Sequence, residues 1–293
     1  MRHLPTCDAC CQMVNFIMTL FERNTFFKAG IFFSAVIVLL ILAASFFIAP
    51  VYTDQEENTR RPVSFFQNIT GFFLKSDYLA VHVTLAAMAL FSFIVIILIF
   101  SFFQRTSASE ILYIVIFVIS FSFESIRLVL PLSWIYSFPS VYLTAASRIL
   151  LFTRVFGSFS LFAAGILAAG FEADKTRYVI FVAGIAAIVI TANIPIDVLD
   201  WDTGLNAANG HNSMFRGIEF AIFITTTSSF FIAAKVRESK EYIFVAIGTA
   251  VALAGRNILL GTDNWLGLVP GLLLLSFGIW FICSKLHKIY LWL

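Results

Sequence analysis

The sequence predicts an all-α protein, a polytopic integral membrane bundle of about eight transmembrane helices. Its 293 residues are 60% hydrophobic and only 12% charged, whereas soluble globular domains are about a quarter charged. The apolar residues also form long continuous runs rather than the alternating pattern of barrel strands, which excludes a β-barrel. A net charge of +2 provides no large basic field, so we expect no nucleic-acid partner.

Eight apolar runs are long enough to cross a bilayer, whose hydrocarbon core of roughly 30 Å requires about 20 helical residues. The first follows a cytoplasmic N-terminal segment, residues 1–25, and is expected to be a retained signal anchor. The fifth and seventh runs are the shortest. In chain order the predicted spans are Phe26–Ala49, Leu79–Phe103, Ile111–Leu132, Leu143–Phe171, Tyr178–Ile196, Met214–Ala234, Tyr242–Leu260 and Leu266–Cys283.

Lys and Arg between the spans predict the orientation. With the N-terminus inside, eleven of them fall on the cytoplasmic side and three, Arg60, Arg61 and Lys75, fall outside. Cytoplasmic loops of membrane proteins carry this excess of positive charge. We therefore expect a multi-pass protein of the cytoplasmic (inner) membrane with both termini cytoplasmic.

The cysteines give no sign of a disulfide or a metal site. Cys7, Cys10, Cys11 and Cys283 all fall on the predicted cytoplasmic side, where thiols stay reduced. His3 could join the first three, but a second ligand pair at the spacing of zinc sites is missing. We expect a reduced tail, no metal and no cofactor.

Regular spacing indicates an internal repeat. Tyr113, Tyr178 and Tyr242 each begin a span that runs from inside to outside, and Arg127 and Arg256 each follow the nearest tyrosine by fourteen residues. We interpret this as a helical hairpin used three times, behind the first two spans and the loop that joins them. Interfacial aromatic belts would produce the tyrosine spacing without a repeat, but they do not predict the matched arginines. The segments are 26–110 with outer loop 51–78, then the six-helix group 111–293 with hairpins 111–176, 177–240 and 241–293.

Charged residues within the spans are the strongest functional signal. An ionised side chain at the centre of a transmembrane helix costs about 2.5–3.5 kcal/mol on insertion scales, so such residues usually face the protein interior. At about 1.5 Å per residue, Arg127 and Arg256 lie roughly 21 Å along their spans, in the outer third. The eight charged residues are Glu124, Arg127, Arg148, Arg154, Asp197, Arg216, Glu219 and Arg256.

Helical spacing assigns most of these charges to shared faces. Glu124 with Arg127, Arg216 with Glu219, and Asn193 with Asp197 are three or four residues apart, so each pair shares one side of a helix. Arg148 and Arg154 lie about 120° apart around their helix. Because both cannot point to one centre, we expect Arg148 to face the cluster.

Five arginines against three carboxylates leave positive charge that an anion would neutralise. Guanidinium groups match carboxylate and phosphate oxygens, so the predicted ligand is an anionic small molecule or a lipid head group. The alternative is a buried ion-pair network that fixes helix register and binds nothing. The predicted ligand-binding residues are Arg127, Arg148, Arg216, Arg256, Glu124, Glu219, Asp197 and Asn193, with Arg154, Asp200, Asp202 and His211 as further candidates.

The segment 194–213 is the most polar stretch between the spans. Asp197, Asp200, Asp202 and His211 offer groups for a divalent cation or for acid–base chemistry, but their spacing matches no calcium loop. Turn residues such as Asp-Thr-Gly explain the composition as a capped loop that leads into the next helix. We interpret it in that way.

These observations predict a sensor or receptor-like module with an outward-facing arginine pocket. Its expected partners are membrane lipid, an anionic ligand and a membrane or cytoplasmic protein that receives the signal. A transporter of an anionic solute is the main alternative, and it would need a polar path through the inner half of the bundle. A membrane enzyme acting on a lipid phosphate and a structural subunit of a membrane complex are further alternatives.

Overall fold

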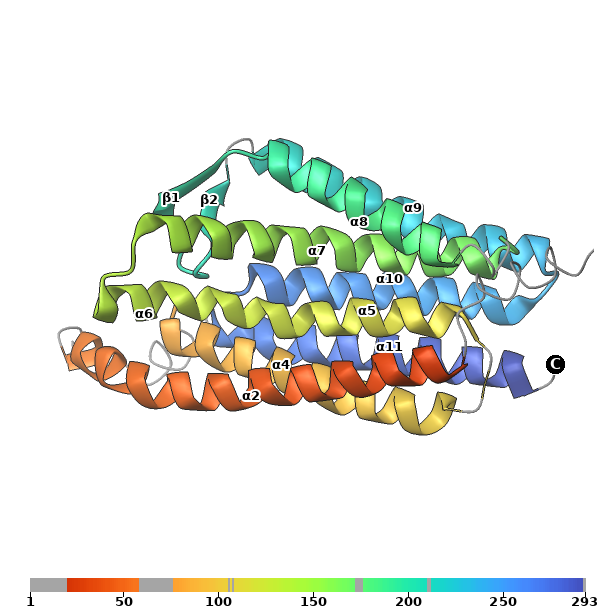
Figure 1. Cartoon of the computed structure of the whole chain (residues 1–293), viewed down its shortest axis with the longest axis horizontal. Helices are drawn as coiled ribbons and strands as arrows, with labels where there is room; N and C mark the ends of the chain where they lie inside the picture. Colours follow the sequence, from red (N-terminus) through yellow and green to blue (C-terminus); the bar gives the residue numbers. More distant parts are fainter. Residues whose placement is uncertain are drawn as a thin grey trace, which may run out of the picture.

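Long helices lying side by side make up the computed structural model, which describes residues 20–57, 76–104, 106, 108–171, 176–209 and 212–291 (Figure 1). Within these residues the all-α membrane bundle is confirmed. The elements are α2 (Leu20–Glu57), α4 (Tyr78–Phe103), α5 (Glu110–Ser122), the 3₁₀ helix η1 (Phe123–Leu128), α6 (Val129–Tyr136), α7 (Ser140–Ala168), α8 (Thr176–Asn193), β1 (Ile196–Trp201), β2 (Ala207–Asn209), α9 (Asn212–Val236), α10 (Lys240–Gly261) and α11 (Trp265–Leu291).

Seven spans in the described ranges are long and apolar enough to cross a bilayer, with α5, η1 and the first part of α6 forming one of them. The remaining predicted span, the fifth in chain order, corresponds to α8. Its apolar part, Tyr178–Asn193, is shorter than the other seven spans. The sequence predicts that this span ends at Ile196, but the helix ends three residues earlier. Pro195 disfavours helical backbone at the residue before it, so the helix ends at Asn193.

Six helices form a closed ring, in the order α4, α5, α7, α9, α10 and α11, with α11 packed back against α4. The other two, α2 and α8, pack on the outside of this ring, α2 mainly against α4 and α8 against α7. The ring includes α4, one of the first two helices of the chain, and does not include α8. The helices therefore associate across the predicted boundary near residue 110.

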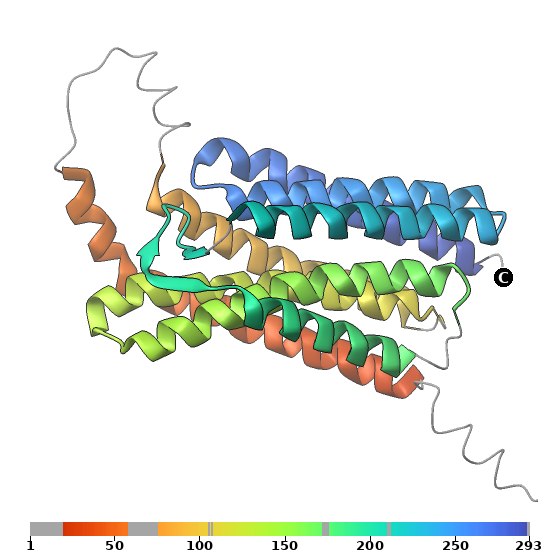
Figure 2. The ribbon, with the colours of Figure 1, turned by 90° about the horizontal axis from the view of Figure 1, so that it is seen from above.

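The helix pairing bears on the predicted repeat. The first and third hairpins, α5 with α7 and α10 with α11, pack as pairs. In the second, α8 and α9 lie on opposite sides of α7 and share few contacts in the described part of the chain (Figure 2). The three segments therefore differ in packing, and their common origin stays a prediction.

The 3₁₀ turn η1 interrupts the span Glu110–Ser133, which we call the central span. Pro131 lies just beyond η1 and has no N–H, so it cannot donate to the carbonyl of Arg127 four residues earlier. In a 3₁₀ helix, side chains three residues apart eclipse each other. Glu124 and Arg127, both in η1, therefore project from the same side of the span.

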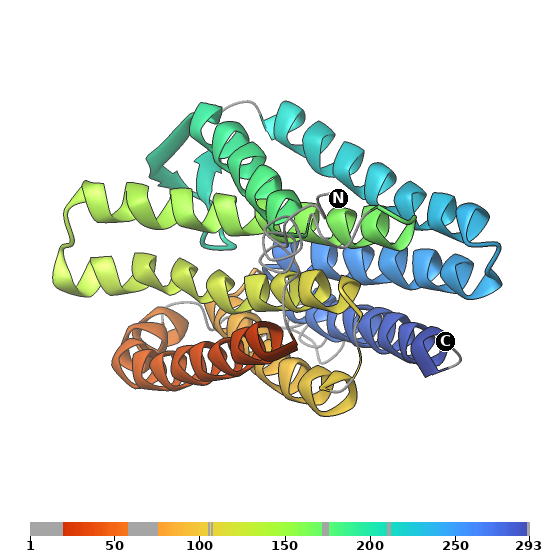
Figure 3. The same ribbon diagram turned by 45° about the vertical axis from the view of Figure 1, so that its right-hand side comes forward.

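An antiparallel hairpin of β1 and β2 closes one end of the bundle, which we call the hairpin end (Figure 3). The sequence predicts a capped loop in this segment, whereas the structure has two strands there. The turn folds inward, because Gly204 and Leu205 are buried and Leu205 packs with Leu128 and Val81. The Lys and Arg distribution predicts that this end faces outward.

Helices α10 and α11 approach each other closely because glycines line their interface. A Cβ atom on Gly255 would lie 2.5 Å from the backbone nitrogen of Leu275, and one on Gly278 would lie 2.5 Å from that of Ala252. Gly217 of α9 has no neighbouring atom within 4 Å of such a Cβ position.

We expect Gly255→Ala to destabilise the fold, because its methyl group would force the backbones of α10 and α11 apart. Overpacking of this kind costs about 1–3 kcal/mol. Thermal unfolding in detergent would measure the loss. The matched change Gly217→Ala should cause no loss, because open space surrounds that position; equal losses in both variants would contradict the interpretation.

Candidate functional site

The candidate site is built around the carboxylate of Glu124, which is 2% exposed. Arg154 of α7 donates to both of its oxygens, from Nε to Oε1 and from Nη2 to Oε2, each at 2.8 Å. Arg127 pairs with the same carboxylate at 2.7 Å. One carboxylate on the central span thus holds two guanidinium groups, one from its own turn and one from the neighbouring helix.

Arg256 brings a third buried guanidinium to the same layer. It donates to the hydroxyl of Ser158 and, at 2.8 Å, to the carbonyl oxygen of Arg154, and its guanidinium carbon lies 6.0 Å from the ring centre of Phe117. Among the described residues it makes no direct ion pair. The buried layer therefore contains three guanidinium groups and one carboxylate.

Two backbone carbonyls also accept hydrogen bonds from Arg127. This side chain donates to the carbonyl oxygen of Gly204 in the hairpin turn at 3.3 Å and to that of Leu260 in the last turn of α10 at 3.4 Å. Carbonyls at a helix C-terminus carry partial negative charge, which favours a cation there. Arg127 thus ties η1 to the hairpin turn and to the end of α10.

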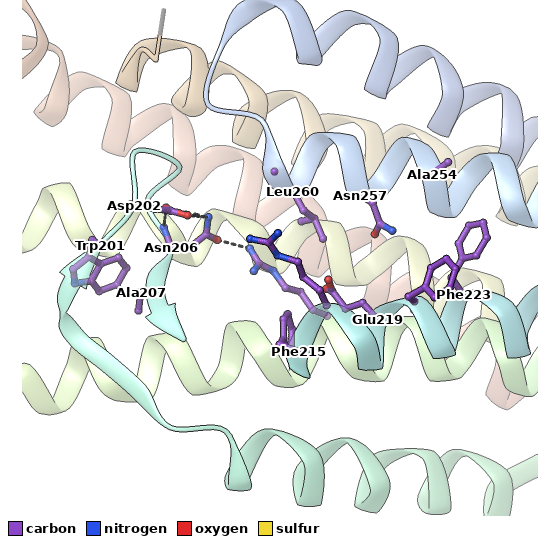
Figure 4. Close-up of a pocket in the computed structure, with 14 residues that line it drawn as sticks. Trp201, Asp202, Asn206, Ala207, Phe215, Glu219, Phe223, Ala254, Asn257 and Leu260 are labelled. Carbon is purple, nitrogen blue, oxygen red and sulfur yellow. Dashed lines mark hydrogen bonds between the residues drawn. The ribbon is translucent and has the colours of Figure 1, made fainter. Parts of the chain in front are cut away.

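Beside this layer lies a pocket of about 760 Å³, which we call the hairpin-end pocket (Figure 4). Its volume falls within the range of small-molecule sites. It is bounded by α7, the β1–β2 hairpin, α9 and α10. The lining residues are Arg154, Trp201, Asp202, Asn206, Ala207, Phe215, Arg216, Glu219, Phe220, Phe223, Ala254, Asn257, Leu260 and Gly261.

Two charged side chains of α9 line the pocket without a direct partner. Arg216 is exposed and Glu219 is half-buried, and neither makes a hydrogen bond or ion pair within the described part of the chain. Figure 4 shows Glu219 on one wall and Asn257, from α10, on the other, with both polar ends toward the space between them. These groups are available to a ligand.

The hairpin turn supplies the remaining polar contact. Asn206 accepts a 2.7 Å hydrogen bond from Nη2 of Arg154 through its side-chain oxygen. Its own amide nitrogen atoms, main-chain and side-chain, donate to Asp202 at 2.7 and 3.2 Å. The turn therefore orients Arg154 at the pocket and brings the negative charge of Asp202 to its rim.

The structure reverses the expected directions of Arg148 and Arg154. Arg154 lies at the centre of the cluster, whereas Arg148 points outward to α8. There it donates to the carbonyl oxygens of Thr191, of Ala192 at 3.1 Å and of Ile194 at 2.8 Å. The expectation that Arg148 faces the cluster was therefore wrong, because the free C-terminal carbonyls of α8 provide it with a different site.

The other predicted residues divide between the cluster and the surface. The structure brings Glu124, Arg127, Arg154 and Arg256 together and places Arg216, Glu219 and Asp202 on the adjoining pocket. Asn193 is exposed and donates to the carbonyl of Val189, and Asp197 is exposed on β1, so neither lines the pocket. The side chain of Asp200, all of His211 and the three N-terminal cysteines lie outside the described residues.

Sequence reasoning missed three polar contributors. Ser158 and Asn206 hold Arg256 and Arg154, and Asn257 lines the pocket. One signal was present in the sequence, since Asn257 directly follows Arg256 near the end of an apolar span. Within the described ranges no group of three His, Cys, Asp or Glu side chains is placed to hold a metal ion.

The chain was compared with protein-family models, with curated proteins and with solved structures, and nothing matched.

A second polar contact fixes the hairpin end from outside the spans. The carboxylate of Asp263, in the short connection between α10 and α11, accepts hydrogen bonds from Ser76 at 2.5 Å and from Thr203 at 2.7 Å. The N–H of Asp77 donates to the Asp263 carbonyl at 2.9 Å. The start of α4, the hairpin turn and the end of α10 are thus joined at one residue.

We expect Glu124→Gln to destabilise the fold by about 3–5 kcal/mol, because it removes the negative charge that two buried guanidinium groups share. Thermal or denaturant unfolding in detergent would measure the change. Glu241→Gln is the matched control, since Glu241 bridges the partly exposed Lys285 and Lys288. Exposed pairs contribute about 0–1 kcal/mol, so a loss of equal size in the two variants would refute the role given to Glu124.

The contact of Asp263 predicts a dependence of stability on acid pH. The hydrogen bonds from Ser76 and Thr203 lower the pKa of its carboxyl group in the folded protein. The stabilisation is therefore present above the pKa of the unfolded chain and is lost as the pH falls through the lower folded pKa. Unfolding measured from about pH 5 down to about pH 2 should be less pH-dependent in Asp263→Asn than in the wild type; identical profiles would contradict this.

Proposed function

We propose that this multi-pass membrane protein binds an anionic small molecule or lipid head group in the hairpin-end pocket and acts as a sensor or receptor-like module. The observation that carries the proposal is the surplus of buried positive charge. Arg127 and Arg154 share the buried carboxylate of Glu124, and the buried Arg256 lies beside them without a direct ion pair among the described residues. Arg154 also borders the pocket, which contains Arg216.

Uncompensated charge beside a cavity favours ligand binding over a purely architectural network. A network that only fixes helix register would be expected to neutralise its own charges, because unpaired buried charge is costly. Here four arginines of the cluster and pocket face Glu124, Glu219 and Asp202. An anion would neutralise the remaining charge, and guanidinium groups are well matched to its oxygens.

The opposite half of the bundle supports a sensor more than a carrier. Below the arginine layer the ring is filled mainly by apolar side chains, among them Phe117, Leu161 and Phe230, all fully buried. The buried hydroxyl groups of Ser160 and Thr249 donate to carbonyl groups of their own helices. A carrier would need a polar path through this half. A sensor would need only a shift of helices that reach both ends of the bundle. Helices α7 and α10 both line the pocket and extend to the opposite end (Figure 1).

The orientation belongs to the same proposal. Lys and Arg lie mostly in the segments at the end opposite the hairpin, which supports a cytoplasmic location for that end and for both termini. The pocket would then lie near the outer side of the cytoplasmic membrane. The signal would pass to a membrane or cytoplasmic protein.

The proposal predicts that inorganic phosphate raises the unfolding temperature of the purified protein in detergent, relative to chloride at equal ionic strength. Arg154→Lys and Arg216→Gln should weaken the apparent phosphate affinity about tenfold, the effect of one lost charge-assisted hydrogen bond. Arg216 is exposed and makes no hydrogen bond or ion pair within the described part of the chain, so its variant tests binding with little loss of structure.

Arg148→Ala is the matched control, because Arg148 lies on the same helix as Arg154 but contacts only the end of α8. It should keep the phosphate response of the wild type. A wild-type protein that does not respond to phosphate, or an Arg148 variant that loses the response as fully as the other two, would refute the proposal.

A further inference from the structure

The hairpin-end pocket opens sideways, between α9 and α10. These two helices meet near the loop that joins them and diverge toward the hairpin end (Figures 1 and 3). At the wide end of this gap Phe220 of α9 and Asn257 of α10 both line the pocket and are both exposed, Phe220 by 65%. Because both lie within spans, the exposed part of the pocket faces the membrane.

The lining of the pocket changes in polarity along its length. Arg154 and Asp202 lie on α7 and the hairpin turn, and Arg216 and Glu219 project from the first part of α9. Farther from the hairpin along α9 and α10 the lining is apolar and consists of Phe220, Phe223 and Ala254. A small hydrophilic anion would use only the first group. An amphiphile would use both groups, with its charged end at the arginines and its apolar part between α9 and α10.

The depth of the charged groups matches that of a lipid head group. Arg216 and Glu219 lie four and seven residues from the start of α9, which corresponds to about 6 and 10 Å along the helix. This places them near the boundary between the hydrocarbon core and the head groups. A lipid in the adjacent leaflet would reach Arg216 by moving sideways.

The charge of the site suits one phosphodiester. Four guanidinium groups, of Arg127, Arg154, Arg216 and Arg256, face the carboxylates of Glu124, Glu219 and Asp202, which leaves one positive charge. A phosphodiester carries one negative charge at neutral pH. Glu219 remains to accept a hydrogen bond from a hydroxyl or ammonium group of the head.

From these observations we infer that the ligand is a membrane lipid with a phosphodiester head group, which enters from the bilayer through the gap between α9 and α10. The inference rests on the proposed anion site and names its ligand class and route of entry. The phosphate lies at Arg154 and Arg216, and the acyl chains leave past Phe220 and Asn257.

The test compares three probes on the full chain in detergent, with native mass spectrometry and the unfolding temperature as readouts. Dioleoyl phosphatidylglycerol has the head group and the chains, glycerophosphoglycerol has the head group alone, and dioleoylglycerol has the chains alone. We expect the complete lipid to bind at least about a hundredfold more tightly than either part, since contacts on both sides of the pocket contribute.

Two tryptophan variants of α10 test the route. Asn257→Trp should fill the gap and weaken the binding of the lipid about tenfold more than it weakens the binding of glycerophosphoglycerol. Ile247→Trp places the same side chain at an exposed position on this helix that does not line the pocket. It should leave both affinities unchanged.

Each other outcome has one meaning. Equal affinity for the lipid and for glycerophosphoglycerol, or no effect of Asn257→Trp, overturns the lipid inference and leaves the anion site standing. Binding of dioleoylglycerol as tight as that of the phospholipid overturns the assignment of the phosphate. If no phosphate-bearing probe binds, the proposed function fails together with the inference.

Discussion

A single buried carboxylate, that of Glu124, determines how the hairpin end is assembled. Two guanidinium groups depend on it. The 3₁₀ turn before Pro131 places Glu124 and Arg127 on the same side of the span, so that Glu124 reaches α7 and Arg127 reaches the hairpin turn. Arg127 in turn binds carbonyl groups of the hairpin turn and of α10. Because unpaired charge is costly in this environment, η1, α7, the hairpin and α10 can only come together in an arrangement that keeps these pairs. The position of the pocket follows from that constraint.

Much of this arrangement could be predicted from the sequence, because helical rise and periodicity are nearly fixed. The depth of Arg127 and Arg256 and the shared face of Glu124 and Arg127 required only residue numbers. Residue numbers alone could not predict which of Arg148 and Arg154 faces the cluster, since that depends on which neighbour lies on each side of α7. The sequence does not reveal that α8 ends beside Arg148 with free carbonyl groups. The inward fold of the hairpin turn, which brings Asn206 to Arg154, was missed for a related reason. Turn residues indicate a reversal of the chain but not its direction relative to the bundle.

The two ends of the bundle serve different physical purposes. At the hairpin end, charges, backbone carbonyls and a cavity lie in one layer, and Asp263 joins three segments above it. In the other half, large apolar side chains fill the ring, and the glycine contacts between α10 and α11 continue from Gly255 beside the arginine layer to Gly248 below it. Rigid packing in one half gives the helices a fixed base from which the hairpin end of α9 diverges. Any rearrangement on binding would therefore be concentrated where α9 and α10 separate.

The short length of α8 has a consequence for the surrounding bilayer. Its 18 residues extend about 27 Å, less than the roughly 30 Å of an average hydrocarbon core, and Arg148 of α7 holds its final carbonyls. A helix fixed in this way cannot tilt to compensate, because tilt shortens its reach further. A transmembrane helix of this length would require the adjacent lipids to compress, because of hydrophobic mismatch, and would favour residence of the protein in thinner membranes.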